Sequence, residues 1–438
     1  MLDTHNSLAA DPKGQFSRML AGGLLAACVV TGAIASLTSW LPTLLAGLLA
    51  WAAGFILWLE VPKRTRVQSA ILLTVGGLGL LVGFVADGSL AWRTAIAGNA
   101  NLIAMLAAVS FLRLITAPSN SEPVVSAYGR RSLLTTIVGV HLFGAVVNLS
   151  TVFIMARRMS DGDTLSRQQY VALVRGFGSA AFWSPFFAAM AAALTYAPGA
   201  QLSSLLAFGL PLAVIALALT YRDVNALGVQ HFRGYPMNFA SLWLPGLLAV
   251  LILGAHWWRP ALSVLGLIAA LAPSVTILTL ALRRQPVGRQ LAHHMREGLP
   301  GMRAELVLFL AAGVMAAGLM SLVAVTGVSL PFDAFGAWQA SALVAGLVGL
   351  SIVGVHPVIG VAAAAPLVAP LDPDPSLLAS CFLAAWGIGV AASPLSAMNL
   401  ALQGAYRLRA GDSLRWNLPF AAAMLVAAAL LFLLHPGA

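Results

Sequence analysis

The chain has 438 residues, of which 60% are hydrophobic and only 9% are charged, and its mean hydropathy is +0.90. A soluble globular protein carries about 25% charged residues, so this composition excludes a large soluble domain and predicts a polytopic membrane protein. The net charge of +10 comes from cations in short segments beside apolar runs, which is typical of membrane topology rather than of nucleic-acid binding. Cys28 and Cys381 lie in separate apolar runs and are expected to be buried thiols.

Residues 1–18 are polar and predict a cytoplasmic tail, with no cleavable signal peptide. A transmembrane helix needs about 20 apolar residues, and about eleven such runs follow the tail. Two further apolar stretches, 132–156 and 340–371, are either spans or re-entrant hairpins. The eleven runs cover 19–39, 41–59, 67–86, 94–115, 176–197, 202–220, 239–256, 261–282, 304–325, 376–406 and 418–435.

The positions of the cations favour hairpins. If both ambiguous stretches return to the side from which they enter, and the N-terminus is cytoplasmic, all of the 24 Lys and Arg residues except Arg93 and Arg259 lie inside. If both stretches cross, about half of the cations move outside, against the positive-inside rule. The predicted fold is therefore an all-α polytopic membrane protein with about eleven transmembrane helices and two opposed re-entrant hairpins. Its C-terminus would be periplasmic, in a bacterial inner (plasma) membrane.

The hairpins arrange the chain as two inverted repeats that follow an extra first span. Each repeat holds one hairpin and, after it, one span that contains a Ser-Pro pair. Inverted repeats with interrupted helices are typical of transporters whose substrate site lies at the repeat interface. The predicted units are the extra span 19–40, repeat 1 over 41–222 with its interrupted span 176–197, a cytoplasmic linker 223–238, and repeat 2 over 239–438 with its interrupted span 376–406.

Two short phrases occur once in each repeat. The run from Ile137 to His141 returns as Ile352 to His356, and Ser184-Pro185 returns as Ser393-Pro394. We expect Gly139 and Gly354 to lie at the hairpin turns, with His141 and His356 directly after them. Each proline removes a backbone hydrogen bond in mid-span, and Gly176, Gly178, Gly387 and Gly389 would loosen the preceding turns. Both spans are thus expected to unwind, so that four helix ends face one cavity suited to an anion and a cation.

Polar residues inside a membrane are costly and usually functional. No Asp or Glu falls in the middle of a predicted span, so proton coupling would use His141 or His356, whereas Na⁺ would bind freed carbonyls and side-chain oxygens. A Na⁺ site is expected near Gly139, Asn148, Ser184, Gly354 and Ser393, and the sequence leaves both couplings open. The predicted substrate-binding residues are His141, Asn148, Ser150, Thr151, Ser184, Pro185, His356, Pro357, Ser393, Pro394, Ser396 and Asn399.

This pattern resembles the ion transporter (IT) superfamily, and most of all the divalent anion/sodium symporter (DASS) family. Ser184-Pro185 and Ser393-Pro394 are similar to the family's Thr-Pro pairs, and Asn148-Leu149-Ser150-Thr151 is similar to its Ser-Asn-Thr signature, which His356-Pro357 replaces in the second hairpin. The resemblance implies a homodimer in which a transport part, 117–220 and 326–416, moves against a scaffold as an elevator. The basic segments 161–175 and 283–303 would be interfacial helices, with His293 and His294 solvated.

The sequence predicts a secondary active transporter of small organic anions, carboxylates above all, coupled to Na⁺ or H⁺. It has no catalytic residue or resident cofactor to offer, and its expected partners are the substrate, the lipid bilayer and a second copy of the chain. One alternative is a membrane-embedded enzyme acting on a lipid-linked substrate, which would need a nucleophile–base or carboxylate pair at matched depth. Another is an uncoupled exporter or channel. The sequence has no GxxxxGK[ST] loop, so ATP drive is unsupported.

Overall fold

The computed structural model describes residues 12–38, 40–116, 127–147, 149–235, 243–328 and 330–438. Helices dominate these residues, and their strands are one antiparallel pair, β1 (Ala127–Tyr128) with β2 (Arg233–Gly234). Within the described ranges, nine helical segments are long and apolar enough to cross a membrane. The protein is therefore an all-α polytopic membrane protein, as its composition predicts.

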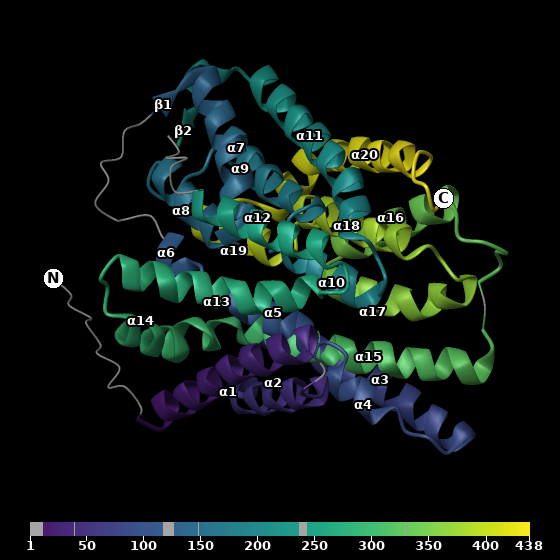
Figure 1. The fold of residues 1–438 in the computed structure, drawn as a ribbon. Coiled ribbons are helices and arrows are strands. Elements are labelled where there is room, and N and C mark those ends of the chain that lie inside the picture. Colours follow the sequence, from purple (N-terminus) through teal and green to yellow (C-terminus); the bar gives the residue numbers. More distant parts are fainter. Residues whose placement is uncertain (1–11, 39, 117–126, 148, 236–242, 329) are drawn as a thin grey trace.

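The helices form two layers, one above the other in Figure 1. The lower one, here called the base layer, combines the first helices of the chain with those that open the second half. Its elements are α1 (Pro12–Leu37), α2 (Thr43–Leu57), η1 (Trp58–Glu60), α3 (Lys63–Asp87), α4 (Trp92–Ala97), α5 (Ala100–Ser110), α6 (Arg113–Thr116), α13 (Val264–Leu282), α14 (Val287–His293), the π-helical turn η5 (His294–Gly298), η6 (Pro300–Met302) and α15 (Arg303–Thr326). The helix α12 (Trp243–Trp258) packs on α13 but lies at the level of the upper helices in Figure 1.

The upper layer, here called the hairpin layer, contains both predicted hairpins and both predicted interrupted spans. It meets the base layer where α10 packs on α5 and α17 packs on α15. Its elements are α7 (Gly129–Val147), α8 (Ser150–Met159), α9 (Arg167–Gly178), η2 (Ser179–Phe182), α10 (Ala188–Tyr196), α11 (Leu202–Ala226), η3 (Val229–His231), α16 (Ala337–Ile352), α17 (Pro357–Val368), η7 (Ala369–Leu371), α18 (Pro375–Ala392), α19 (Ala397–Tyr406) and α20 (Ala410–Phe432).

Small residues hold α3 against α15 at the heart of the base layer. A methyl group on Gly76 would lie 2.5 Å from the backbone of Val314, and one on Gly79 would lie 2.4 Å from the carbonyl oxygen of Gly318. The two backbones are therefore in direct contact, which is the usual way for helices to associate in lipid, where burial of apolar surface gives no driving force. The opposite face of α3 exposes large apolar side chains such as Ile71 and Leu78, as a lipid-facing surface does.

The count of nine differs from the predicted eleven for two physical reasons. The span predicted over 176–197 is divided into α9, η2 and α10, none of which is long enough to cross by itself. The span predicted over 239–256 corresponds to α12, which has 16 residues and whose predicted first residues, 239–242, lie outside the described ranges. The predicted span 376–406 is kept among the nine, although its helix is interrupted between α18 and α19.

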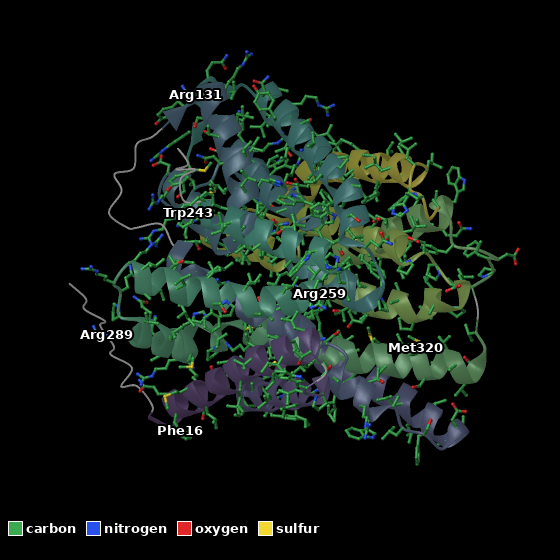
Figure 2. All side chains as sticks on the ribbon, viewed as in Figure 1. Phe16, Arg131, Trp243, Arg259, Arg289 and Met320 are labelled. Carbon is green, nitrogen blue, oxygen red and sulfur yellow. The ribbon has the colours of Figure 1, made fainter. Side chains whose placement is uncertain are left out.

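The first hairpin, α7 with α8, enters and leaves at one end of the molecule. Gln169 Nε2 donates to the carbonyl oxygen of Met159 at the end of α8 (2.7 Å) and to that of Arg233 (3.0 Å). Arg233 pairs in turn with Tyr128, the residue before α7. One side chain thus ties together the start and the end of this hairpin. Arg131 and Arg289 lie at this same end of the molecule, the left-hand end in Figure 2.

The second hairpin, α16 with α17, enters and leaves at the opposite end (Figure 1). Its flanking residues Gly336 and Asp374 both lie against the C-terminus, since a methyl on Gly336 would be 3.9 Å from Ala438 and one on Gly437 would be 2.4 Å from the Asp374 carboxyl carbon. The 25-residue helix α11 connects the two ends of the layer. It starts beside Ser376, whose Oγ accepts from the N–H of the residue before the helix at 3.0 Å. The hairpins are therefore opposed.

Candidate substrate-binding site

Each hairpin packs against the interruption in the span that follows it. In repeat 1 the helix stops after η2, passes Ser184-Pro185 in a non-helical conformation and restarts at Ala188. Ser184 is fully buried, and its Oγ donates to the carbonyl oxygen of Ala145 near the end of α7 (2.5 Å) and accepts from the N–H of Phe186 (3.2 Å). The hydroxyl therefore fastens the first interruption to the inner end of the first hairpin.

In repeat 2 the side-chain amide of Asn399 forms hydrogen bonds with backbone carbonyls at the interruption. The fully buried Asn399 donates both Nδ2 hydrogens, to the carbonyl oxygens of Ser393 (2.7 Å) and Val390 (3.3 Å), and its Oδ1 accepts from the hydroxyl of Tyr170 (2.8 Å). An Asn amide has two N–H donors, so no donor is left for a substrate. The structure places this predicted ligand in a supporting role.

Two neighbours complete the second interruption. Ser396 caps α19 by accepting from the N–H of Asn399 (3.3 Å) and donates to the Val390 carbonyl (3.2 Å). Gln403 Nε2 donates to the carbonyl oxygen of Pro394 (2.8 Å). Backbone groups at membrane depth must be satisfied within the protein, and this set of side chains does so at the place where Pro394 breaks the helix.

His141 lies inside α7 and not at the hairpin turn, because α7 runs unbroken from Gly129 to Val147. Gly139 is likewise in mid-helix, so the expectation of a turn there is wrong. Trp183 Nε1 donates to His141 Nε2 (3.0 Å), and His141 Nδ1 faces the hydroxyl of Ser179 (2.8 Å). Indole is a donor only, so Nε2 is the acceptor and Nδ1 carries the proton. A second proton on Nε2 would face the indole N–H, so this conformation has no place for it.

The turn of the second hairpin is built as the sequence predicts. Gly354 has φ of 98°, a left-handed conformation that favours glycine. His356 caps α17, because its Nδ1 accepts from the N–H of Val358 (3.3 Å), and Pro357 occupies the first helical position. The imidazole packs edge-on against Trp386, with ring centroids 5.7 Å apart. The two histidines of the repeated phrase therefore occupy different kinds of position.

A residue of the base layer reaches this turn. Arg64, in the first turn of α3, donates from Nη2 to the carbonyl oxygen of Gly354 (3.0 Å) and from Nη1 to that of Leu395 in the second interruption (3.2 Å). Gln68 Nε2 also donates to the Gly354 carbonyl (3.3 Å). Sequence reasoning placed Arg64 in a cytoplasmic loop, since a contact between residues 290 positions apart leaves no local signal.

These contacts occupy the carbonyl oxygens that were expected to hold Na⁺ near Gly354 and Ser393. In this conformation, the oxygens of Gly354, Ser393, Pro394 and Leu395 all accept from protein N–H groups. A cation that binds there would have to displace an amide or the guanidinium of Arg64. The guanidinium itself supplies a positive charge at the second hairpin turn.

The remaining predicted ligands cluster after the first hairpin turn. Thr151 is buried in the first turn of α8, and its hydroxyl has no hydrogen-bond partner among the described residues. Asn148 and the side chain of Ser150 lie outside the part of the chain that the structure describes. Gln169 and Arg158 stand at the other end of α8 and do not take part in the site.

The two interrupted spans cross at glycines, where neither backbone carries a side chain. A methyl on Gly178 in α9 would lie 3.2 Å from the carbonyl oxygen of Gly387 in α18, and one on Gly387 would lie 2.4 Å from the ring of Phe182. Gly176 and Gly389 fit equally closely against the first arms of the hairpins that precede them, α7 and α16. These glycines therefore allow close packing within regular helix, and the expectation that they loosen it is wrong.

A cavity of about 90 Å³ lies between the two layers, beside the first interruption. Phe186 and Ala188 line it from the hairpin layer, and Ser110, Arg113 and Glu305 line it from the base layer. His294, expected to be solvated, is instead buried behind this wall. Its Nε2 is 2.9 Å from Ser110 Oγ, and its ring packs on Phe111 at 4.5 Å. His293 beside it is exposed as predicted.

The fold and these contacts define a polytopic membrane protein with two opposed hairpins that meet two interrupted, crossing helices. No family model matches the chain, and no curated protein matches it. Among solved structures, the chain is similar to one described as the YdaH transporter of Alcanivorax borkumensis, with an unusual topology. The likeness has 14% sequence identity and a TM-score of 0.48, and it covers 83% of this chain and 97% of that one.

Proposed function

We propose that this protein is a secondary active transporter of small organic anions, in the first place carboxylates. The observation that carries the proposal is the docking of each hairpin on the interruption of the following span, from opposite ends of one layer. Ser184 makes that contact in repeat 1, and Gly354 and Leu395 make it in repeat 2. Such inverted repeats can reach an outward-open and an inward-open state of similar energy around one site.

The two-layer architecture supports a transport part that slides on a scaffold. The hairpin layer contains the transport part that the family resemblance implies, but it also contains α20, most of which the resemblance assigns to the scaffold, because α20 packs on α18, α16 and α11. The layers meet through α10 and α17, the helices that leave the first interruption and the second turn. A substrate held at these helix starts would travel with the hairpin layer. The homodimer and the bacterial inner membrane, with a cytoplasmic N-terminus, remain predictions.

Positive electrostatics at the turns favour an anion. The helix α17 starts at Pro357 and presents the positive end of its dipole toward the turn, where the N–H groups of Val358 and Ile359 both donate to His356. The guanidinium of Arg64 lies within 3.0 Å of the same turn. An anion there would compensate both charges, so the second turn is one place in the protein where a substrate's negative charge is favoured.

The experiment must distinguish H⁺ from Na⁺ as the coupling ion. Proton coupling through His141 would require the Trp183 hydrogen bond to break. Sodium coupling at the second interruption would require Arg64 to leave the carbonyls that it occupies. We therefore expect any coupling to depend on a conformational change at one of these two places.

The test is transport by the purified full chain in proteoliposomes. Labelled mono-, di- and tricarboxylates are offered under an inward Na⁺ gradient, under an inward proton gradient and under neither. We expect saturable uptake of at least one carboxylate above that of protein-free liposomes, with accumulation under one gradient. Exchange without accumulation would make the protein uncoupled. No flux of any carboxylate, with protein that still melts cooperatively, would contradict the proposal.

A further inference from the structure

The cavity between the layers presents one cation and one anion from the same wall. Arg113 stands in the first turn of α6, and Glu305 in the first turn of α15. Both side chains are exposed and line the same cavity. Over the described residues, the ion pairs within 4.0 Å involve Arg18, Arg175, Arg222 and Arg407, and neither cavity residue belongs to one. The two charged side chains therefore line one cavity without forming an ion pair with each other in the described structure.

The floor of the cavity comes from the hairpin layer. Phe186 and Ala188 line it, and they follow directly on Ser184-Pro185. Ala188 opens the nine-residue helix α10, so the positive end of that helix faces the cavity. A negative group bound to Arg113 would therefore also be stabilised by α10. A ligand placed here would contact both layers.

The wall behind the charges is rigid. Ser110 Oγ donates to the carbonyl oxygen of Ala107 (2.6 Å), so the Ser110–His294 hydrogen bond of 2.9 Å is donated by His294 Nε2. His294 opens a π-helical turn, a form that often marks functional sites, and its ring fills the space that a side chain at Gly298 would need. These two hydrogen bonds use one lone pair of the Ser110 hydroxyl, and Ser110 lines the cavity. Polar hydrogen bonding thus fixes the wall on which Arg113 stands.

We propose that this cavity binds a small amino carboxylate, a molecule that carries a carboxylate and an ammonium group a few bonds apart. The carboxylate would pair with Arg113 and the start of α10, and the ammonium would pair with Glu305. Arginine suits the carboxylate because its planar fork can donate two parallel hydrogen bonds. A volume of about 90 Å³ restricts the ligand to a few heavy atoms. The inference rests on the proposed transport function and narrows its substrate class.

The first test is binding to the purified full chain in detergent at constant ionic strength. The probes are acetate, methylammonium, glycine, β-alanine and γ-aminobutyrate, measured by thermal shift and by calorimetric titration. We expect one of the three amino acids to bind at least about tenfold more tightly than acetate or methylammonium. Equal affinity of acetate and all the amino acids, or binding of none of the probes, would overturn the proposal.

Two variants locate the site. Arg113→Gln should weaken the preferred amino acid about tenfold or more, and Glu305→Gln should lower its affinity to that of acetate. Arg93→Gln and Asp333→Asn are matched controls, since both residues are exposed, neither lines the cavity, and the substitutions remove the same charges. We expect the controls to bind as the wild type does. Unchanged affinity in Arg113→Gln would also overturn the site.

Transport by the same variants separates this inference from the proposed function. If Arg113→Gln carries carboxylates with an unchanged KM, the protein is a transporter but the cavity is not its substrate site. If the wild type binds an amino acid at this cavity but moves no carboxylate or amino acid, the site stands and the transport function fails. If both binding and uptake fall together in Arg113→Gln and not in Arg93→Gln, both proposals are supported.

Discussion

The contact of Arg64 with the second hairpin turn gives the sharpest test of the sliding-layer proposal. Arg64 belongs to the base layer, whereas its acceptors, the carbonyls of Gly354 and Leu395, belong to the hairpin layer. Any displacement of one layer along the other must break both hydrogen bonds. Arg64→Ala should therefore destabilise the conformation described here relative to all others, without unfolding either layer.

The size of the effect follows from the geometry. A buried hydrogen bond from a charged donor contributes about 1.5–3 kcal/mol, but Arg64 is exposed, and exposed charged contacts are worth about 1 kcal/mol or less. Two such bonds give about 1.4 kcal/mol, which is tenfold in an equilibrium constant. If the two states are equally populated in the wild type, this conformation falls from about 50% to about 10%.

The reactivity of a cysteine placed at the second hairpin turn measures the population of the conformation described here. The side chain of Val353 is 70% exposed beside the Arg64 contact, whereas both native cysteines are buried. Val353→Cys should react with a membrane-impermeant thiol reagent, and Arg64→Ala in that background should slow the reaction about fivefold. Arg66→Ala is the matched control, because Arg66 lies on the same turn and its guanidinium donates to the carbonyl of Leu59 in its own layer. Equal rates in all three proteins would refute the reasoning.

Four further changes test how the interruptions are held together. Asn399→Ala should lower the free energy of unfolding by about 3 kcal/mol, since it removes three buried hydrogen bonds of about 1 kcal/mol each, although the Ser393 and Val390 carbonyls each keep one donor from Ser396. Gln403→Ala, which strands one carbonyl, should cost about 1 kcal/mol, and equal melting temperatures for the two variants in detergent would contradict this. His141→Ala should lower the melting temperature along with uptake, since it leaves the Trp183 N–H unpaired. Full stability with lost uptake would instead return His141 to the substrate site. Gly387→Val should abolish monodisperse protein on gel filtration, because its side chain would meet Phe182 within 2.4 Å.

Apolar length and proline position made the overall architecture predictable. A long hydrophobic run must become a helix in lipid, because no other local structure satisfies its backbone. Ser184-Pro185 and Ser393-Pro394 cannot continue a helix without losing a hydrogen bond, so the positions of the interruptions can be read from the sequence. The opposition of the hairpins follows from the cations between the runs, because their placement decides which side each loop occupies.

The repeated phrase gave a wrong prediction for the first copy, because the residues that follow the phrase differ between the two copies. Gly354 lies at a turn because Pro357 forces the residue before it, His356, out of helical conformation. Gly139 and His141 are followed by Leu142 and Phe143, which continue the helix and move the turn beyond Val147. The same five letters therefore specify a turn in one copy and a helix interior in the other. The position of the turn is therefore predicted by the proline and not by the glycine.

Contacts between distant segments were beyond the reach of the sequence. Arg64 looks like any cation at the end of a span, and His294 looks like its exposed neighbour His293. Only the packing of α3 beside the second turn, and of η5 against Phe111, sets them apart. The pairing of Arg113 and Glu305 on one cavity wall is of the same kind, since 192 positions separate them in the chain.

The two hairpin turns are held by different contacts, although they belong to duplicated halves of the chain. Ser184 secures the first hairpin to its own layer, so that contact is carried along unbroken in any sliding motion. The second hairpin is secured across the layers by Arg64 and Gln68, so of the two hairpins it alone must let go before the layers can move. Two halves built to one plan thus differ in what a transport cycle must break: the second hairpin turn has to release Arg64 and Gln68, and on the first side it is α10 rather than the hairpin that has to release the base layer, where Asn99 donates to the Tyr196 hydroxyl at 2.7 Å.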